Sequence, residues 1–209
     1  MSSVESLGLL RDPVVLSAVI LAGGASRRMG KDKAWLDVGG CRLIERQVAV
    51  AREVGATEVM ISGRPGADYS SLGLPVLLDE TPDLGPMSGV KRAFEAMRGT
   101  ALLVLAVDLP AMTGAVLKEL LLGTKPGQGA VPQWETGDLE PLVAVYPAGA
   151  REMITDFWTQ GRYSMQAFAR ACAEAGSVAL VGIPEADRSF FTNWNRPADF
   201  PAGGQPPTR

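Results

Sequence analysis

A short apolar run that breaks into a glycine-rich, basic turn constrains this chain more than any other stretch. Residues 18–21 are small, branched or leucine-type, which suits a buried strand. Gly23 and Gly24 follow, and without a Cβ they let the backbone turn and present its N–H groups to an anion. The turn then carries four cations against the single anion Asp32, namely Arg27, Arg28, Lys31 and Lys33. We therefore predict a phosphate site at the end of a strand.

The spacing of this turn excludes two better-known phosphate loops. A P-loop has four residues between its glycines and continues Gly-Lys-Ser/Thr, whereas five residues separate Gly24 from Gly30 and Asp32 follows Lys31. The dinucleotide fingerprint G-x-G-x-x-G is also absent, because Gly23 and Gly24 are adjacent. The turn therefore belongs to neither an ordinary ATPase nor an NAD-binding protein.

Composition narrows the class of protein. With 209 residues, 46% of them hydrophobic, we expect one domain over 1–209, with a core at about 14–200 and a disordered tail at 201–209. The net charge of −3 argues against a nucleic-acid or anionic-membrane partner, and no run is long enough for a membrane span. Nothing demands more than a monomer. The two distant cysteines, Cys41 and Cys172, indicate reduced thiols in a cytoplasmic protein.

The chain has no histidine, which limits its chemistry. The commonest general base and the usual ligand of transition metals are therefore missing. Any metal would have to be held by oxygen atoms, which indicates Mg²⁺, with Mn²⁺ as the alternative.

Hydrophobic periodicity predicts alternating strands and helices. The expected strands are 14–21, 58–62, 76–79, 101–107, 129–132, 142–146 and 177–183. The expected helices are 43–54, one opened by 84–89 and stopped by Gly99, 115–122, 150–159 and 164–175. We therefore predict a three-layer, doubly wound, mostly parallel α/β fold of Rossmann-like type, with an antiparallel strand near 142–146.

Asp108 follows the most apolar of the expected strands, 101–107. Ligands of open α/β sheets bind beyond the carboxyl ends of the strands, where Gly23, Asp79 and Asp108 should all emerge. Asp108 is therefore the candidate Mg²⁺ ligand, with an N-cap for the helix after Pro110 as the alternative. The four cations of the turn are candidate phosphate ligands, with a solvated basic face as the alternative.

Five motifs resemble those of one family. The turn reads L-A-G-G-x-S-x-R-M-G-x-D-K, which is similar to the signature loop of nucleotidyltransferases of the nucleoside-diphospho-sugar type. In this full form it most resembles the molybdenum cofactor guanylyltransferases. The other motifs are Gly-Pro-Met-Ser-Gly at 85–89, Val-Asp-Leu-Pro at 107–110, Glu-Pro-Leu-Val-Ala-Val-Tyr at 140–146 and Asn-Trp-Asn-Arg-Pro at 193–197. They occur in the family's order.

The resemblance implies a set of site residues. The catalytic residues would be Arg28, Lys33 and Asp108, with Asp108 also the metal ligand. The nucleotide would contact Leu21, Ala22, Gly23, Gly24, Lys33, Ser62, Asp79, Gly85, Pro86, Gly89 and Asp108. The acceptor would contact Asn193 and Asn195. Ser62 departs from the family, which has an amide side chain there, and Asp79 and the two asparagines also fit simple turn-forming roles.

The implied activity is a Mg²⁺-dependent transfer of GMP from GTP to the terminal phosphate of molybdenum-loaded molybdopterin, giving the guanine dinucleotide cofactor. The Gly23-Gly24 pair favours GTP, because cytidylyl relatives typically read Ala-Ala-Gly there. The alternatives are a cytidylyltransferase, a guanylyltransferase with another phosphorylated acceptor, and a non-catalytic adaptor that binds nucleotide or cofactor. The resemblance also implies transient contacts with the protein that delivers the cofactor and with the apo-enzymes that receive it.

Overall fold

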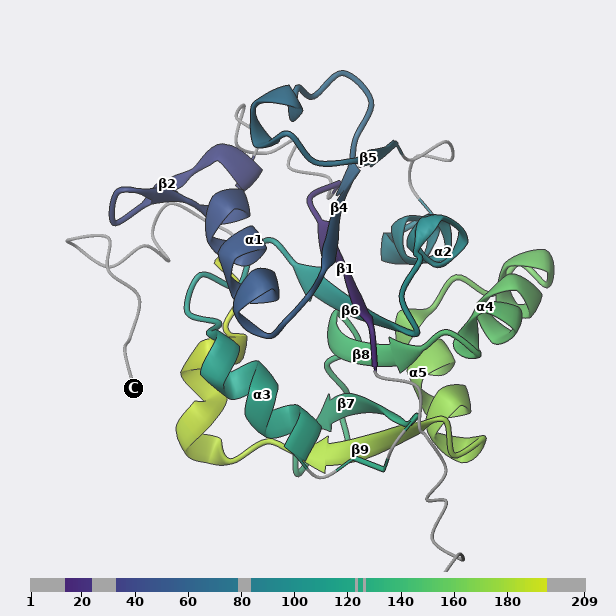
Figure 1. The fold of residues 1–209 in the computed structure, drawn as a ribbon. Helices are drawn as coiled ribbons and strands as arrows, with labels where there is room; N and C mark the ends of the chain where they lie inside the picture. Colours follow the sequence, from purple (N-terminus) through teal and green to yellow (C-terminus); the bar gives the residue numbers. More distant parts are fainter. Residues whose placement is uncertain (1–13, 24–32, 79–83, 123, 126, 195–209) are drawn as a thin grey trace, which may run out of the picture.

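A single twisted sheet forms the centre of the molecule in the computed structural model, which describes residues 14–23, 33–78, 84–122, 124–125 and 127–194. Among these residues, seven strands pair in the order β5-β4-β1-β6-β8-β7-β9 (Figure 1). Their bounds are β1 Leu16–Leu21, β4 Glu58–Gly63, β5 Val76–Leu78, β6 Ala101–Ala106, β7 Gly129–Gln133, β8 Val143–Pro147 and β9 Val178–Gly182.

The sheet is parallel except at β8, which runs antiparallel to both of its neighbours. Leu103 of β6 pairs with Val145 of β8, and Ala130 of β7 pairs with the same Val145. This confirms the antiparallel strand predicted near 142–146. Because β7 and β9 again run parallel to β6, the carboxyl ends of six strands and the start of β8 share one edge of the sheet. We call this the carboxyl edge.

Helices cover both faces of the sheet, as a three-layer fold requires (Figure 1). One face carries α1 Leu43–Glu53 and α3 Gly114–Leu122, and the other carries α2 Pro86–Ala96, α4 Ala150–Thr159 and α5 Met165–Glu174. Short 3-10 helices are η2 Lys33–Trp35, η3 Ser70–Leu72 and η4 Glu185–Phe191, and β2 Asp37–Val38 pairs with β3 Cys41–Arg42 in a small hairpin. In the described part of the chain, no helix is both long and apolar enough to cross a membrane.

The central strand β6 shows why its sequence is apolar throughout. Leu103 and Leu105 face the core under α1 and α3, whereas Leu102 and Val104 face the core under α2, α4 and α5. All six residues of β6 are buried, because a central strand of a three-layer fold is covered on both faces. The uninterrupted apolar run thus places Asp108 directly after the most buried strand.

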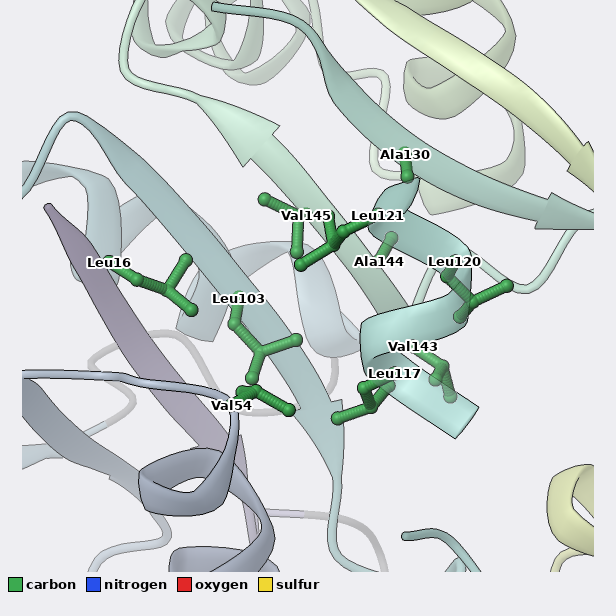
Figure 2. Close-up of a pocket in the computed structure, with 10 residues that line it drawn as sticks. All are labelled: Leu16, Val54, Leu103, Leu117, Leu120, Leu121, Ala130, Val143, Ala144 and Val145. Atoms are coloured by element: carbon green, nitrogen blue, oxygen red, sulfur yellow. The ribbon is translucent and has the colours of Figure 1, made fainter. Parts of the chain in front are cut away.

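The contact between α3 and the sheet encloses a wholly apolar cavity (Figure 2). Leu117 and Leu121 of α3 point toward Leu103 and Val145 of the sheet, and Val54 closes the end beside α1. None of the predicted site residues lines this cavity, and its lining offers no charged side chain. It belongs to the packing of the core.

The predicted elements agree closely with the observed ones, and the differences lie at ends and in short turns. The first strand starts at Leu16, two positions later than expected, because residues 14 and 15 precede the ladder. The helix at 150–159 has the expected bounds. The helical turns η2, η3 and η4 were not expected, since turns of three to seven residues leave too short a periodicity in the sequence.

Candidate active site at the carboxyl edge

The basic turn begins where β1, β4 and β6 end side by side. The backbone N–H of Ala22 donates to the carbonyl of Ser62 at 2.9 Å, and the N–H of Val107 donates to the carbonyl of Leu21 at 3.2 Å. These bonds extend the parallel ladders past the last strand residues. Residues 22 and 107 are thereby held next to one another, so the glycine turn and Asp108 start from adjacent points.

Lys33 and Asp108 meet in space although 75 positions separate them. Nζ of Lys33 donates to Oδ2 of Asp108 at 3.1 Å. The side chains are 12% and 24% exposed, so the pair is shielded yet reachable by a small ligand. The candidate phosphate cation and the candidate metal ligand therefore lie in direct contact.

The alternative role for Asp108, capping the next helix, is not realised. Helix α3 begins at Gly114, and the hydroxyl of Thr113 accepts a hydrogen bond from the N–H of Val116 at 3.3 Å. Thr113 therefore caps the helix. The carboxylate of Asp108 is available to Lys33 and to a ligand.

Two distant segments fix the turn that presents Asp108. The N–H of Trp194 donates to the carbonyl of Asp108 at 3.0 Å, and Nε2 of Gln47 donates to the carbonyl of Leu109 at 2.6 Å. Trp194 is 6% exposed and Gln47 fully buried. Because both donors are buried in the core, these two hydrogen bonds fix the backbone of the turn. The carboxylate of Asp108 stays available to Lys33.

Gln47 is a positioning candidate that sequence reasoning missed. It lies on the apolar stripe of α1, at helical spacing from Leu43, Ile44 and Ala51, where a polar side chain is unexpected. A polar residue at a buried position of the helix was the sequence signal that could have identified Gln47. Its Oε1 atom is buried and has no hydrogen-bond partner among the described residues, so its single observed bond is the one to Leu109.

The Gly-Pro-x-x-Gly motif forms the start of α2. Gly85 is the N-cap with φ 77°, a left-handed conformation that favours glycine, and Pro86 occupies the first turn. A Cβ on Gly89 would lie 2.2 Å from Oγ of Ser62 and 3.3 Å from a methyl of Leu21. The glycine therefore lets α2 approach the ends of β4 and β1. Ser62 is 5% exposed and packs beneath this helix.

Unlike Gly89, Gly23 is not required by close packing. A Cβ there would come no closer than 3.7 Å to the backbone of Ser62 and Gly63, which is ordinary van der Waals contact. Packing among the described residues thus leaves room for a side chain. The missing side chain is consistent with a ligand that approaches the turn closely.

The donor set fits Mg²⁺ better than a softer metal. Within the described residues, no group of three or more Asp, Glu, Cys or His side chains is placed to cage a metal ion. Mg²⁺ does not need such a cage, because it is commonly held by one or two carboxylates together with substrate phosphates and water. Asp108, partly exposed at the carboxyl edge, matches that pattern.

Comparison with known proteins identifies the family. Residues 18–176 match the model of the MobA-like NTP transferase domain. A protein of Opitutus terrae named "Probable molybdenum cofactor guanylyltransferase" is 39% identical over 88% of this chain and 92% of its own length. The "Molybdenum cofactor guanylyltransferase" of Xanthomonas euvesicatoria is 34% identical, with the same coverage of both chains.

The chain belongs to the molybdenum cofactor guanylyltransferase family. The crystal structure of molybdopterin-guanine dinucleotide biosynthesis protein A from Archaeoglobus fulgidus has the same fold, with a TM-score of 0.64 and 22% identity over 88% of this chain and 94% of that one. The predicted family and the predicted α/β fold are both confirmed.

Several residues that the guanylyltransferase resemblance singled out are now placed. Leu21, Ala22, Gly23 and Ser62 lie at the ends of β1 and β4, and Gly85, Pro86 and Gly89 at the start of α2. Asn193 is exposed and directly precedes Trp194, which bonds to Asp108. Gly24, Arg28, Asp79 and Asn195 lie outside the described residues, and so does the tail 201–209.

A second pair on the carboxyl edge was not singled out from the sequence. Nε1 of Trp134 donates to Oε1 of Glu140 at 2.7 Å, across the loop that joins β7 to β8. Burial raises the pKa of the Glu140 carboxyl, the nearby charge of Asp138 raises it further, and the Trp134 hydrogen bond opposes both. Glu140 is the first residue of the motif at 140–146, but no sequence pattern indicates that Trp134, six residues earlier, is its partner.

Proposed function

We propose that the protein transfers GMP from GTP to the terminal phosphate of molybdenum-loaded molybdopterin, which yields the guanine dinucleotide form of the cofactor and pyrophosphate. The observation that carries this proposal is the pairing of Lys33 with Asp108 beside the glycine turn, in a chain of the guanylyltransferase family. The reaction forms a bond from an acceptor phosphate oxygen to the α-phosphorus of GTP. The bond between that phosphorus and the pyrophosphate oxygen breaks.

Asp108 would hold Mg²⁺, or Mn²⁺ in its place, at this site. When bound, the ion supplies positive charge that offsets the charge of the nucleotide phosphates. Lys33 supports the assignment, because its ammonium group balances the carboxylate in the absence of a cation. With substrates bound, the ammonium group of Lys33 would contact a phosphate oxygen.

The residues of this chain would act by orientation and by electrostatics. A phosphate acceptor is already a nucleophile at neutral pH, so the lack of histidine is no obstacle. Lys33 would stabilise the charge that builds up on the reacting phosphoryl group, and Arg28 would bind the leaving pyrophosphate as a planar fork. Gln47 and Trp194 hold the Asp108 turn, so that the carboxylate need not reorganise during the reaction.

The two substrates would approach Asp108 from opposite sides. Of the predicted nucleotide contacts within the described residues, Leu21, Ser62 and Gly89 lie on β1, β4 and α2, all on one side of β6 in the strand order. The other side of β6 is formed by β8, β7 and β9 and by the segment that carries Asn193. The acceptor would therefore lie over β8 and β7, with its phosphate directed at Asp108.

The protein that delivers the cofactor and the apo-enzymes that receive it would bind this protein transiently in the cytoplasm.

Mass analysis of the products tests the proposal. The purified protein is incubated with MgCl₂, molybdenum-loaded molybdopterin and either GTP or CTP. We expect a guanine dinucleotide and pyrophosphate with GTP only, and no product after chelation of Mg²⁺ with EDTA. A cytosine dinucleotide would identify a cytidylyltransferase. No product with either nucleotide, despite tight nucleotide binding, would contradict the proposal and favour another acceptor or the adaptor role.

A further inference from the structure

The loop between β7 and β8 holds Glu140 and Trp134 in a fixed arrangement. The N–H of Glu140 donates to the carbonyl of Pro132 at 2.9 Å, and the N–H of Trp134 donates to the carbonyl of Asp138 at 2.9 Å. Together with the indole-to-carboxylate bond of 2.7 Å, these contacts anchor both the backbone and the side chain of Glu140. The carboxylate is therefore presented by a rigid hairpin end.

The strand register brings Glu140 close to the reaction centre. The pairing of β6 with β8 continues one step beyond the strands, because the N–H of Ala106 donates to the carbonyl of Leu142 at 2.9 Å. Glu140 precedes Leu142 by two residues, and Asp108 follows Ala106 by two, so both lie just beyond the paired strands at the carboxyl edge. Glu140 thus lies on the side of Asp108 that faces away from the predicted nucleotide contacts.

Neither the fold nor the proposed catalysis accounts for this carboxylate. Glu140 is half-buried, and within the described part of the chain no cation forms an ion pair with it. A carboxylate has about four acceptor positions, and the indole of Trp134 uses one of them. Because the group is only half-buried, its remaining acceptor positions are open to water or to a ligand.

We propose that Glu140 is a specificity residue of the acceptor subsite, which binds a planar heterocycle through two adjacent N–H donors, as on the edge of a pterin that carries its ring N–H and 2-amino group. Two parallel donors match the two oxygens of a carboxylate in a bidentate pair. The proposal rests on the proposed function, which supplies an acceptor with a pterin. Such a ring over β8 and β7 leaves the acceptor's phosphate free to reach Asp108.

Trp134 is a positioning residue in this subsite. Phe191 packs against its ring edge-to-face with centroids 5.5 Å apart, and the guanidinium of Arg188 lies 4.7 Å from the ring centroid. Arg188 is itself held by a bidentate pair with Glu185. Because the indole is immobilised in this way, its N–H sets the direction in which the Glu140 carboxylate points.

The decisive variant is Glu140→Gln, which keeps an oxygen for the Trp134 hydrogen bond but replaces the second carboxylate oxygen with a donor. We expect the KM for molybdopterin to rise about tenfold to a hundredfold, whereas kcat and the KM for GTP stay within about twofold of wild type. Glu135→Gln is the matched control, because Glu135 is an exposed carboxylate of the same loop. Trp134→Phe should raise the acceptor KM in the same direction but less.

Direct binding separates this inference from the proposed function. Quenching of tryptophan fluorescence by 6-hydroxymethylpterin should report binding to the wild type and much weaker binding to Glu140→Gln. The corresponding lumazine, which carries an oxygen in place of the 2-amino group, should bind poorly to both. A wild type that binds the pterin but makes no dinucleotide from GTP would contradict the proposed function and leave the subsite standing.

Three results would overturn the subsite. The first is an acceptor KM and a pterin affinity that Glu140→Gln leaves unchanged. The second is equal binding of the pterin and the lumazine by the wild type. The third is a raised Mg²⁺ requirement in Glu140→Gln with an unchanged acceptor KM, which would make Glu140 a metal-site carboxylate instead.

Discussion

Nζ of Lys33 lies 3.1 Å from Oδ2 of Asp108, at the edge of the sheet where β1 and β6 end. Lys33 follows the glycine turn and Asp108 follows the most buried strand, so the contact joins the two strongest functional signals of the sequence. The two side chains form an ion pair in a partly buried place. The pair therefore marks the point where phosphate and metal would meet.

Loss of either charge of this pair should abolish catalysis while the fold survives. For Asp108→Asn and for Lys33→Met we expect kcat to fall by at least about a hundredfold, because each removes preorganised charge at the reacting phosphates. The free energy of unfolding should fall by about 1–3 kcal/mol, since each change leaves the other, mostly buried group without this partner. Steady-state kinetics and urea denaturation measure the two effects.

Lys118→Met is the matched control for the loss of a lysine charge. It breaks the exposed ion pair between Lys118 of α3 and Glu53 of α1. It should leave kcat unchanged. An Asp108→Asn enzyme with wild-type kcat would contradict the metal assignment.

Gln47→Leu should impair catalysis more than stability. The change removes the donor to the Leu109 carbonyl, but it also removes the buried and unpaired Oε1, so the two effects on the free energy of unfolding offset each other. We expect kcat to fall about tenfold, because the Asp108 turn loses one of its anchors. The KM for GTP should stay near the wild-type value.

Gln47→Glu distinguishes positioning from mere packing. A carboxylate cannot donate to the Leu109 carbonyl, but a protonated carboxyl group can. The kcat of this variant, relative to wild type, should therefore recover as the pH is lowered. A pH-independent deficit would argue that Gln47 only fills space.

Gly89→Ala should displace the start of α2, because its Cβ would lie 2.2 Å from Oγ and 3.0 Å from Cβ of Ser62. Overpacking of this kind costs about 1–3 kcal/mol of stability. The KM for GTP should rise as well, since Gly85 and Pro86 move with the helix. The double variant Ser62→Gly with Gly89→Ala frees the space and should recover much of both losses, which a thermodynamic cycle measures. Additive losses would contradict this packing argument.

Glu140 should give the folded protein a distinctive pH dependence. Burial raises the pKa of its carboxyl above the ordinary value of 4.5, so in that pH range the folded state binds more protons than the unfolded state. The free energy of unfolding contributed by this group therefore falls as the pH rises from about 4.5 through the raised pKa. Charged groups near the Trp134–Glu140 pair include Asp138, Arg188 and Arg170, whose guanidinium donates to the carbonyl of Gly137 in the same loop.

Glu140→Gln should remove this contribution. Urea denaturation between about pH 4 and pH 7 should show that the variant gains stability relative to wild type as the pH rises. If the difference between the two proteins is independent of pH, the carboxylate carries no net desolvation penalty.

The layered α/β architecture, the antiparallel strand near 142–146 and the family were all predictable from the sequence. These depend on local information. The apolar run 101–107 must be a covered strand, helix 150–159 repeats its apolar positions at helical spacing, and the glycine turn carries its chemistry within a few residues.

The contacts between distant groups were not predictable in this way, because they depend on how the elements pack. Lys33 contacts Asp108 across 75 positions and Gln47 contacts the next residue, Leu109, across 62, because the strand order sets β1 beside β6 and packs α1 against both. The hydrogen bond from Trp134 to Glu140 and the place of Glu140 at the same sheet edge as Asp108 depend on the reversal of β8. Periodicity describes one element at a time, whereas these contacts depend on how the elements are ordered and packed.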